Sequence, residues 1–477
     1  MTRLKEFLDS GVRVEDHLDV IAMLASLEYI EKGSPRVGKG IEQELIDQRN
    51  SLKLIASENY SSLRVQLTMG NWLTDKYAEG IPYQRYYAGC QNVDDIESYT
   101  QDLAKKLFGA EAVTVQPHSG CDANIAAYLA ILSEVVEGSK VKQMGKPLFQ
   151  MNREEYELVR QDFTRARIFG MALKDGGHLT HGFRNNISGK LFDAYSYGVD
   201  PLTEMLNYEE IRKQAKEIQP HIFVVGYSAY SRHIDFSVMR SIADEVGAVL
   251  MVDMAHFSGL VAGKVFTGIH DPVLHADIVT STTHKTLRGP RGGMILSKKR
   301  FEEGLKRVCP LVQGGPLEHV IAAKAVAFEE ALSNDFQKYA HQIVENASAL
   351  SRHFMDHGVR IVSGGTDNHL MVLDVFDSFG ITGKDAEERL YKSGIIVNKN
   401  AIPNDPRGVI QTSGIRIGTP AITTLNMGVS EMQEVANCIV RCLKGEDPAK
   451  IKADVQHLKA RYPLYKGISL GKLCHTN

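Results

Sequence analysis

The stretch DIVTSTTHKTLRGPRGG, residues 277–293, joins a short apolar strand to a polar turn. Hydroxyl residues follow the apolar part, then His284 and Lys285, and a loop of glycine and proline with two arginines completes the stretch. A lysine held by a strand end in a polar pocket that favours anions is placed where a Schiff-base lysine would lie. The remainder of the chain should therefore supply the partners that such a lysine needs.

Other apolar strands precede and follow this stretch. We expect strands at 112–116, 222–226, 248–252, 277–281 and 293–297, with helical patterns between them. Near-continuous apolar strands that alternate with helices imply a parallel or mixed sheet covered on both faces. The sequence thus predicts an α/β fold with a mixed, mostly parallel central sheet.

The chain of 477 residues is too long for one compact core. We predict an N-terminal helical arm at 1–55, a large domain at 56–333 and a smaller C-terminal α+β domain at 334–477. Within the arm, a break around Ser34–Gly40 should separate one helix from a second that starts at Ile41. Residues 133–166 are charged and should form a surface insertion in the large domain.

Composition is that of an ordinary soluble protein, with 43% hydrophobic and 24% charged residues. A net charge of −3 gives no reason to expect nucleic acid as a partner, and no apolar run is long enough to cross a membrane. The six cysteines have no paired metal spacing, and the first eleven residues lack an apolar signal core. We therefore expect a cytoplasmic protein.

Chemically distinctive residues follow several of the predicted strands. They are Ser119-Gly120, Ser228, Asp253 with His256, and His284 with Lys285. Ligands bind at the carboxyl ends of strands in open α/β sheets, so these residues should meet in one site. Ser119-Gly120 also opens a predicted helix, and such a turn binds anions.

Pyridoxal phosphate requires a set of partners that this chain can supply. Lys285 could form the Schiff base, and Asp253 could pair with the pyridine nitrogen. His178 or His256 could stack on the ring, and Ser119-Gly120 could bind the phosphate. Arg416, on a predicted strand, could bind a substrate carboxylate bidentately.

Two other kinds of site are weaker interpretations. Arg288 and Arg291 could bind a nucleotide phosphate, but the chain has neither a Walker loop nor a dinucleotide glycine motif. His178 and His181 have a spacing that would suit metal ligands, yet no third ligand follows at a zinc-like interval, so we expect no metal site.

Long motifs in this chain resemble those of the serine hydroxymethyltransferase family. The resemblance spans roughly Ile41 to the C-terminus and includes the lysine stretch. Its other motifs are Ser57-Glu58-Asn59-Tyr60, Tyr77-Ala78-Glu79-Gly80, Gln116-Pro117-His118-Ser119-Gly120, Gly176-Gly177-His178-Leu179-Thr180-His181, Val252-Asp253-Met254-Ala255-His256, Gln313-Gly314-Gly315-Pro316, Ser363-Gly364-Gly365-Thr366-Asp367-Asn368-His369 and Thr412-Ser413-Gly414-Ile415-Arg416.

This resemblance implies a fold-type-I pyridoxal-phosphate enzyme, similar to aspartate aminotransferase in fold. It further implies at least a homodimer whose active sites are shared between subunits. The family interconverts serine plus tetrahydrofolate with glycine plus 5,10-methylenetetrahydrofolate. We accordingly expect serine, glycine and tetrahydrofolate as the small-molecule partners, and neither nucleic acid nor membrane.

The resemblance also implies roles for individual residues. Catalytic roles fall to Lys285, Glu79, His284, Thr282 and Tyr87, with Glu79 moving protons and Thr282 and His284 orienting the lysine. Cofactor binding falls to Ser119, Gly120, Cys121, His178, Ser228, Asp253, Ala255, His256, Lys285 and Gly315, the last from the partner subunit. Substrate binding falls to Ser57, Tyr77, Glu79 and Arg416. Folate binding falls to Leu173, Gly177, His178, Leu179 and Asn400.

The chain departs from the bacterial pattern of the family at four places. Cys121 replaces a common serine, Arg288 replaces a small residue, 133–166 has the character of an insertion, and Gly408-Val409-Ile410 stands where Ser-Pro-Phe is frequent. Two alternatives therefore stay open. One is folate-independent aldol cleavage of 3-hydroxy amino acids, or alanine racemisation, on the same site. The other is a non-catalytic role on the same fold, either regulatory or nucleic-acid-binding.

Overall fold

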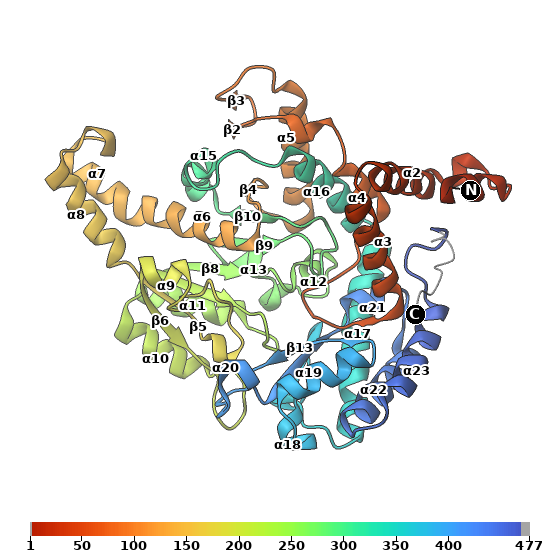
Figure 1. Cartoon of the computed structure of the whole chain (residues 1–477). Coiled ribbons are helices and arrows are strands. Elements are labelled where there is room, and N and C mark those ends of the chain that lie inside the picture. Colours follow the sequence, from red (N-terminus) through yellow and green to blue (C-terminus); the bar gives the residue numbers. More distant parts are fainter. Residues whose placement is uncertain (1, 469–477) are drawn as a thin grey trace.

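A seven-stranded sheet forms the centre of the molecule (Figure 1). The computed structural model describes residues 2–468. The strand order is β4-β10-β9-β8-β7-β5-β6, and β10 runs antiparallel to both of its neighbours. The other described pairs are parallel, which confirms the mixed, mostly parallel sheet. The strands are β4 (Ala112–Thr114), β5 (Arg167–Met171), β6 (Asp193–Tyr197), β7 (Ile222–Gly226), β8 (Val249–Asp253), β9 (Ile278–Thr282) and β10 (Gly293–Ser297).

Helices cover both faces of this sheet, because its central strands are apolar on both sides. Every residue of β7, β8, β9 and β10 is buried. Ile222 and Val224 of β7 belong to the core beneath α6 (Gly120–Leu132), whereas Phe223 and Val225 belong to the opposite core. This opposite core also takes apolar residues from α5 (Gln91–Phe108), α11 (Phe236–Val246) and α16 (Glu318–Ala331).

A second core lies in the C-terminal part of the chain. Its antiparallel sheet has the order β11-β14-β13, formed by Leu370–Asp374, Gly414–Gly418 and Asn398–Asn400. Strand β1 (Leu52–Lys53) pairs with β12 (Ile395–Ile396), so the end of the predicted arm also packs here. The surrounding helices are α17 (Asn334–Asp356), α18 (Val375–Phe379), α19 (Gly383–Lys392), α20 (Gly408–Gln411), α21 (Pro420–Thr424), α22 (Val429–Leu443) and α23 (Pro448–Arg461).

Helix α17 connects the large-sheet core that contains Phe223 with the C-terminal core. Ile343 packs into the former and Leu350 into the latter. The domain boundaries at 55/56 and 333/334 stay predictions. The shorter elements of the first part are α4 (Leu63–Thr68), β2 (Gly80–Ile81), β3 (Gln84–Arg85), α9 (Ile187–Leu191), α10 (Tyr208–Ile218), α12 (Ser258–Ala262), α13 (Pro272–His275), α14 (Glu302–Lys306) and α15 (Val308–Leu311).

The N-terminal arm contains α1 (Arg3–Asp9), α2 (Leu18–Gly33) and α3 (Pro35–Asn50). The expected start of the last helix at Ile41 is wrong, because the helix begins six positions earlier with proline in its first turn. Gly38 lies inside α3, where a Cβ would come within 2.6 Å of the Glu31 backbone. This glycine therefore permits close packing of α2 on α3.

Residues 133–166 form a helical projection from the body (Figure 1). Helix α6 continues through a π-helical turn at Ser133–Glu137 into α7 (Gly138–Met144), and α8 (Arg153–Thr164) returns toward the sheet. No helix among residues 2–468 has the length and apolar content needed to cross a bilayer.

Candidate active site

The carboxyl ends of β7, β8 and β9 place Ser228, Asp253 and Lys285 at the same edge of the sheet. Asp253 is the last residue of β8, and Lys285 lies three residues beyond β9. Both side chains are buried, with relative exposures of 7% and 9%. A buried amine beside a buried carboxylate is the arrangement that the sequence led us to expect.

Asp253 is held by three donors. Its Oδ2 accepts hydrogen bonds from Asn124 Nδ2 at 2.9 Å and from His181 Nε2 at 3.1 Å, while Oδ1 accepts one from the Ala255 amide at 3.0 Å. Burial by itself would raise the pKa of Asp253, but His181, His178 and Lys285 together hold that pKa well below its usual value. The carboxylate therefore stays ionised.

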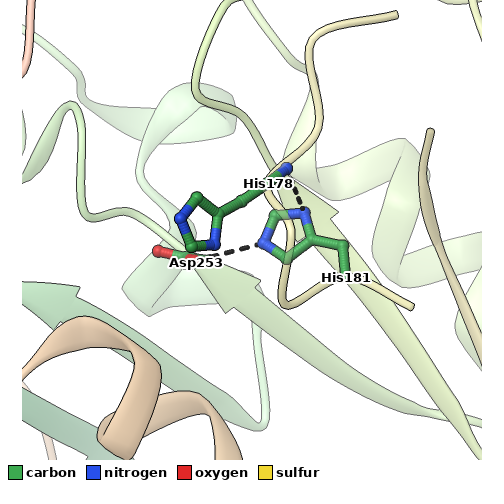
Figure 2. Close-up of side chains that lie close together, drawn as sticks. All are labelled: His178, His181 and Asp253. Carbon is green, nitrogen blue, oxygen red and sulfur yellow. Dashed lines mark hydrogen bonds and ion pairs between the residues drawn. The ribbon is translucent and has the colours of Figure 1, made fainter. Parts of the chain in front are cut away.

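His178 lies beside Asp253 and His181, as Figure 2 shows. The His181 ring is 5.9 Å from the His178 ring, and His178 Nδ1 lies 2.7 Å from Thr180 Oγ1. Burial lowers the pKa of His178 to about 4, so its ring is neutral and suited to stacking. Sequence spacing gave no third candidate metal ligand beside His178 and His181. In the structure Asp253 is such a candidate, because ligand atoms of the three residues lie within 4.8 Å of one another. The contact between His181 and Asp253, however, has the length of a hydrogen bond.

Lys285 is activated by its surroundings. Burial lowers its pKa to about 8, with Asp253 opposing the shift and Arg416 adding to it. Its backbone carbonyl accepts a hydrogen bond from Asn59 Nδ2 at 2.8 Å, which fixes the loop. About a tenth of the amine is therefore neutral, and so nucleophilic, near pH 7, a far larger share than for an ordinary lysine.

The residues that flank the lysine contact the backbone around it. Thr282 Oγ1 donates to the Ala255 carbonyl at 3.2 Å, which joins the loop after β9 to the loop after β8. Burial lowers the pKa of His284 to about 3, and its Nδ1 lies 3.4 Å from the Gly292 amide. Both residues can orient the lysine loop.

Ser119 and Gly120 form the start of α6, as predicted. Ser119 Oγ accepts from the Asp122 amide at 3.2 Å and donates to the Asp122 carboxylate at 3.0 Å. A Cβ on Gly120 would lie 2.7 Å from the Thr282 methyl, so this turn packs tightly against β9. Cys121 is exposed as a residue, but its thiol is partly desolvated, and this desolvation, with the negative charge of Asp253, raises the pKa of the thiol.

His256 is buried next to the small sheet. Its Nδ1 lies 3.3 Å from Nε2 of His369, and the two rings stack with their centroids 5.5 Å apart. Burial lowers the pKa of both imidazoles. The positive charges of Lys285 and Arg416 lower it further. Two neutral rings thus join the loop after β8 to the residue that precedes β11.

Arg416 reaches the same region from β14. Its Nη1 donates to the Ser228 carbonyl at 2.6 Å and its Nε to Asn398 Oδ1 at 3.2 Å. Burial lowers the pKa of this guanidinium to about 10, and it forms no ion pair within residues 2–468. Ser57 lies in the segment after β1. The preceding residue, Ala56, packs against Gly418 at the end of β14.

A cleft of about 620 Å³ opens beside His178. Of the residues predicted for folate, Leu173, His178 and Asn400 line it, together with Ser228 and Val409 from the atypical Gly408-Val409-Ile410 segment. Gly177 and Leu179 do not line it, although Leu179 is exposed nearby in sequence. The cleft is large enough for an aromatic, drug-sized ligand.

Glu79, Tyr77 and Tyr87 form a separate, exposed cluster. The two tyrosine hydroxyls lie 3.4 and 3.2 Å from the Glu79 carboxylate, and the tyrosines are 60% and 47% exposed. Gly315 belongs to this cluster, because a Cβ there would lie 3.7 Å from the Tyr77 ring, and its carbonyl lies 2.9 Å from His118 Nε2. Within the described chain, no hydrogen bond or ion pair joins Glu79 to Lys285.

Sequence reasoning missed the partners of Asp253. Asn124 lies one helical turn into α6, and it also accepts a hydrogen bond from Thr280 Oγ1 at 2.6 Å. His181 was considered only as a metal ligand. The one signal in the sequence is that Asn124 is a polar residue in an otherwise apolar stretch of the helix.

These residues fit pyridoxal phosphate. The ionised Asp253 carboxylate suits a protonated ring nitrogen, the neutral His178 suits the ring face, and the Lys285 amine suits the aldehyde. The fold and this set of residues define the class of fold-type-I pyridoxal-phosphate enzymes.

Comparison with known proteins identifies the family within this class. The model of the family described as serine hydroxymethyltransferase matches residues 30–147 and 149–439. A protein named serine hydroxymethyltransferase from Chlamydia pneumoniae is 50% identical over 95% of this chain and 95% of its own. Another of that name from Treponema pallidum is 50% identical over 97% of this chain and 84% of its own. One from Cutibacterium acnes is 51% identical over 93% of this chain and 90% of its own. The chain belongs to the serine hydroxymethyltransferase family.

Proposed function

We propose that this protein interconverts serine and glycine and transfers the hydroxymethyl carbon to tetrahydrofolate, giving 5,10-methylenetetrahydrofolate. Family membership over nearly the whole chain supports the reaction. The observation that carries it in the structure is the buried Lys285 amine at the strand ends beside the ionised Asp253. Nothing in the site or the comparisons favours the folate-independent reactions or a non-catalytic role.

Lys285 would bind pyridoxal phosphate covalently, and Ser119, Gly120 and Cys121 would receive its phosphate at the start of α6. When bound, the cofactor supplies an electron-withdrawing ring that stabilises negative charge at the substrate α-carbon. Asp253 would hold a proton on the ring nitrogen, while Asn124 and His181 keep that carboxylate fixed and ionised. His178, Ala255, His256 and Ser228 would define the walls around the ring.

Arg416 would bind the substrate carboxylate together with Ser57. Its guanidinium is buried and has no carboxylate partner within the described residues, so it is available to an anionic ligand. A bidentate pair in a buried place fixes orientation as well as affinity. Thr282 and His284 would keep the Lys285 amine directed at the bound amino acid.

Tetrahydrofolate would occupy the cleft lined by Leu173, His178 and Asn400. Gly177 and Leu179 would act from the adjoining turn. Because Val409 also lines this cleft, the Gly408-Val409-Ile410 segment would contact the same ligand. The cleft shares His178 and Ser228 with the amino-acid site, so the carbon could pass between two adjacent ligands.

Glu79, Tyr77 and Tyr87 would complete the site of a second subunit in a homodimer. Their exposure, and that of neighbouring Trp72 at 92%, supports a role at a surface between subunits. Glu79 would move a proton there as general acid and base. Gly315 would contact the phosphate of the same neighbouring site. The five described cysteines are free thiols, which supports a cytoplasmic location.

Serine turnover with and without tetrahydrofolate tests the proposed reaction. We expect glycine and methylenetetrahydrofolate to form in equal amounts, and the Lys285→Ala variant to form neither. Serine consumption that is unaffected by tetrahydrofolate would contradict the proposal.

A further inference from the structure

Lys324 is a buried lysine that the proposed chemistry does not use. It lies on α16 and is only 1% exposed. Its Nζ donates hydrogen bonds to three backbone carbonyls, those of Val115 at 2.5 Å, Gly293 at 2.8 Å and Pro117 at 3.1 Å. All three N–H groups of the ammonium are therefore used, two by carbonyls that follow β4 and one by the first residue of β10.

These three carbonyls belong to two loops of the proposed site, the one that leads to the Ser119-Gly120 turn and the one that carries Lys285. Val115 and Pro117 lead from β4 to Ser119, and Gly293 ends the loop that carries Lys285. The loops are also in direct contact. The Gly293 amide donates to the Pro117 carbonyl at 2.9 Å, and a Cβ on Gly293 would lie 2.2 Å from the Ser119 carbonyl.

The charge on Lys324 is expensive to bury. Burial lowers the pKa of Lys324 to about 7, whereas Glu97 and Glu318 act in the opposite direction. Both acids are buried, and Glu97 also accepts from Arg85 Nη2 at 2.8 Å. An apolar side chain would avoid this desolvation cost but would leave three carbonyls without the Lys324 donor, so the buried charge serves to hold those carbonyls together.

We propose that Lys324 is a positioning residue, whose ammonium fixes the Ser119-Gly120 turn relative to the Lys285 loop so that both ends of pyridoxal phosphate are bound at once. The inference rests on the proposed function, since it assigns the phosphate to Ser119-Gly120. Lys324 touches neither the phosphate nor the aldehyde in this account. It acts only through the three carbonyls.

The test compares binding of pyridoxal phosphate with that of pyridoxal, which lacks the phosphate. In the Lys324→Met variant, we expect affinity for pyridoxal phosphate to fall by about 10-fold or more, as for other supporting residues of a binding site. Affinity for pyridoxal should change little, because the Lys285 amine remains. Titration of the apoprotein, followed by visible absorbance, measures both.

Lys459 provides a matched control. It is another buried lysine, 2% exposed, on α23 in the second core, and its Nζ has no hydrogen-bond partner among the described residues. The Lys459→Met variant should bind both compounds as the unmodified protein does. An effect of equal size in both lysine variants would reduce Lys324 to a general stability role and overturn the inference.

A second variant covers the case in which Lys324→Met does not fold. In Gly292→Ala, the new Cβ would lie 2.5 Å from Lys324 Cε, so the ammonium must move although it is still present. The same selective loss of pyridoxal phosphate binding is expected. An unchanged preference for pyridoxal phosphate over pyridoxal in a folded variant would contradict the inference. Failure of the unmodified protein to bind pyridoxal phosphate would instead contradict the proposed function.

Discussion

At the scale of single residues, the buried charge on Asp253 depends on its neighbours. A carboxylate in a closed site loses hydration, and only several donors can replace that loss. Here Asn124, His181 and the Ala255 amide do so. The carboxylate is thereby ready to hold a proton on a ring nitrogen without first being reorganised.

Replacement of Asp253 by asparagine should test that role with almost no change in shape. We expect kcat to fall roughly 10- to 100-fold, the equivalent of losing one charge-assisted hydrogen bond. Pyridoxal phosphate should still attach, because Lys285 is retained. Steady-state kinetics and the visible spectrum measure the two effects separately, and an Asp253→Asn enzyme with unchanged kcat would show that the carboxylate has no such role.

Lys285 should react with pyridoxal at a lower pH than an ordinary lysine. The neutral amine is the nucleophile, and a lowered pKa means that this form accumulates earlier as pH rises. The rate of attachment to the apoprotein should therefore increase with pH and level off above about 8. A rate that continues to rise toward pH 10 would indicate an ordinary amine.

The partners of these residues lie beyond the reach of local sequence patterns. Lys285, Asp253, His178 and Arg416 could be proposed because each follows or occupies a recognisable strand or motif. The contacts of Asp253 with His181 and Asn124, by contrast, cross 72 and 129 residues of chain. Only the folded sheet shows that helix α6 and the Gly176–His181 turn meet there.

At the scale of elements, glycines allow the loops around Lys285 to approach one another. A Cβ on Gly259, in α12, would lie 2.2 Å from the Thr286 carbonyl, directly after the reactive lysine. The Thr286 hydroxyl also accepts from the Gly259 amide at 2.9 Å. Helix α12 is therefore one support of the lysine loop.

The Gly259→Ala variant should lower the free energy of unfolding by about 1–3 kcal/mol, because the backbone has to move to admit a methyl group. It should also weaken cofactor binding. Gly40→Ala is the control, since this exposed glycine of α3 has open space around it and alanine there should stabilise the helix by about 0.5–1 kcal/mol. Urea denaturation of both variants gives the comparison. Equal stability of the two variants would argue against the tight contact.

Strand patterns explain which elements could be predicted. Strands β7–β10 each contain a short apolar run, and the predicted ranges agree with the observed ones to within about one residue. The edge strand β6 was not predicted, because three of its five residues are exposed and it shows no apolar run. The start of α3 was missed because two glycines suggested a break, whereas Gly38 serves close helix packing.

At the scale of the whole molecule, no hydrogen bond or ion pair joins Glu79 to Lys285 within residues 2–468. If Glu79 completes the site of a second subunit, two different inactive variants should restore activity when combined. Mixed dimers of Lys285→Ala and Glu79→Gln would contain one site with both residues intact. With random exchange, about a quarter of the original activity should return. No recovery after verified subunit exchange would place both residues in one subunit's site.

The central claim is that Lys285 binds pyridoxal phosphate, and borohydride reduction tests it most directly. Reduction makes the bond between cofactor and lysine permanent, and peptide mass mapping then identifies the modified residue. We expect one pyridoxyl group per chain, on Lys285. A label on another lysine, or no label in a protein incubated with pyridoxal phosphate, would contradict it.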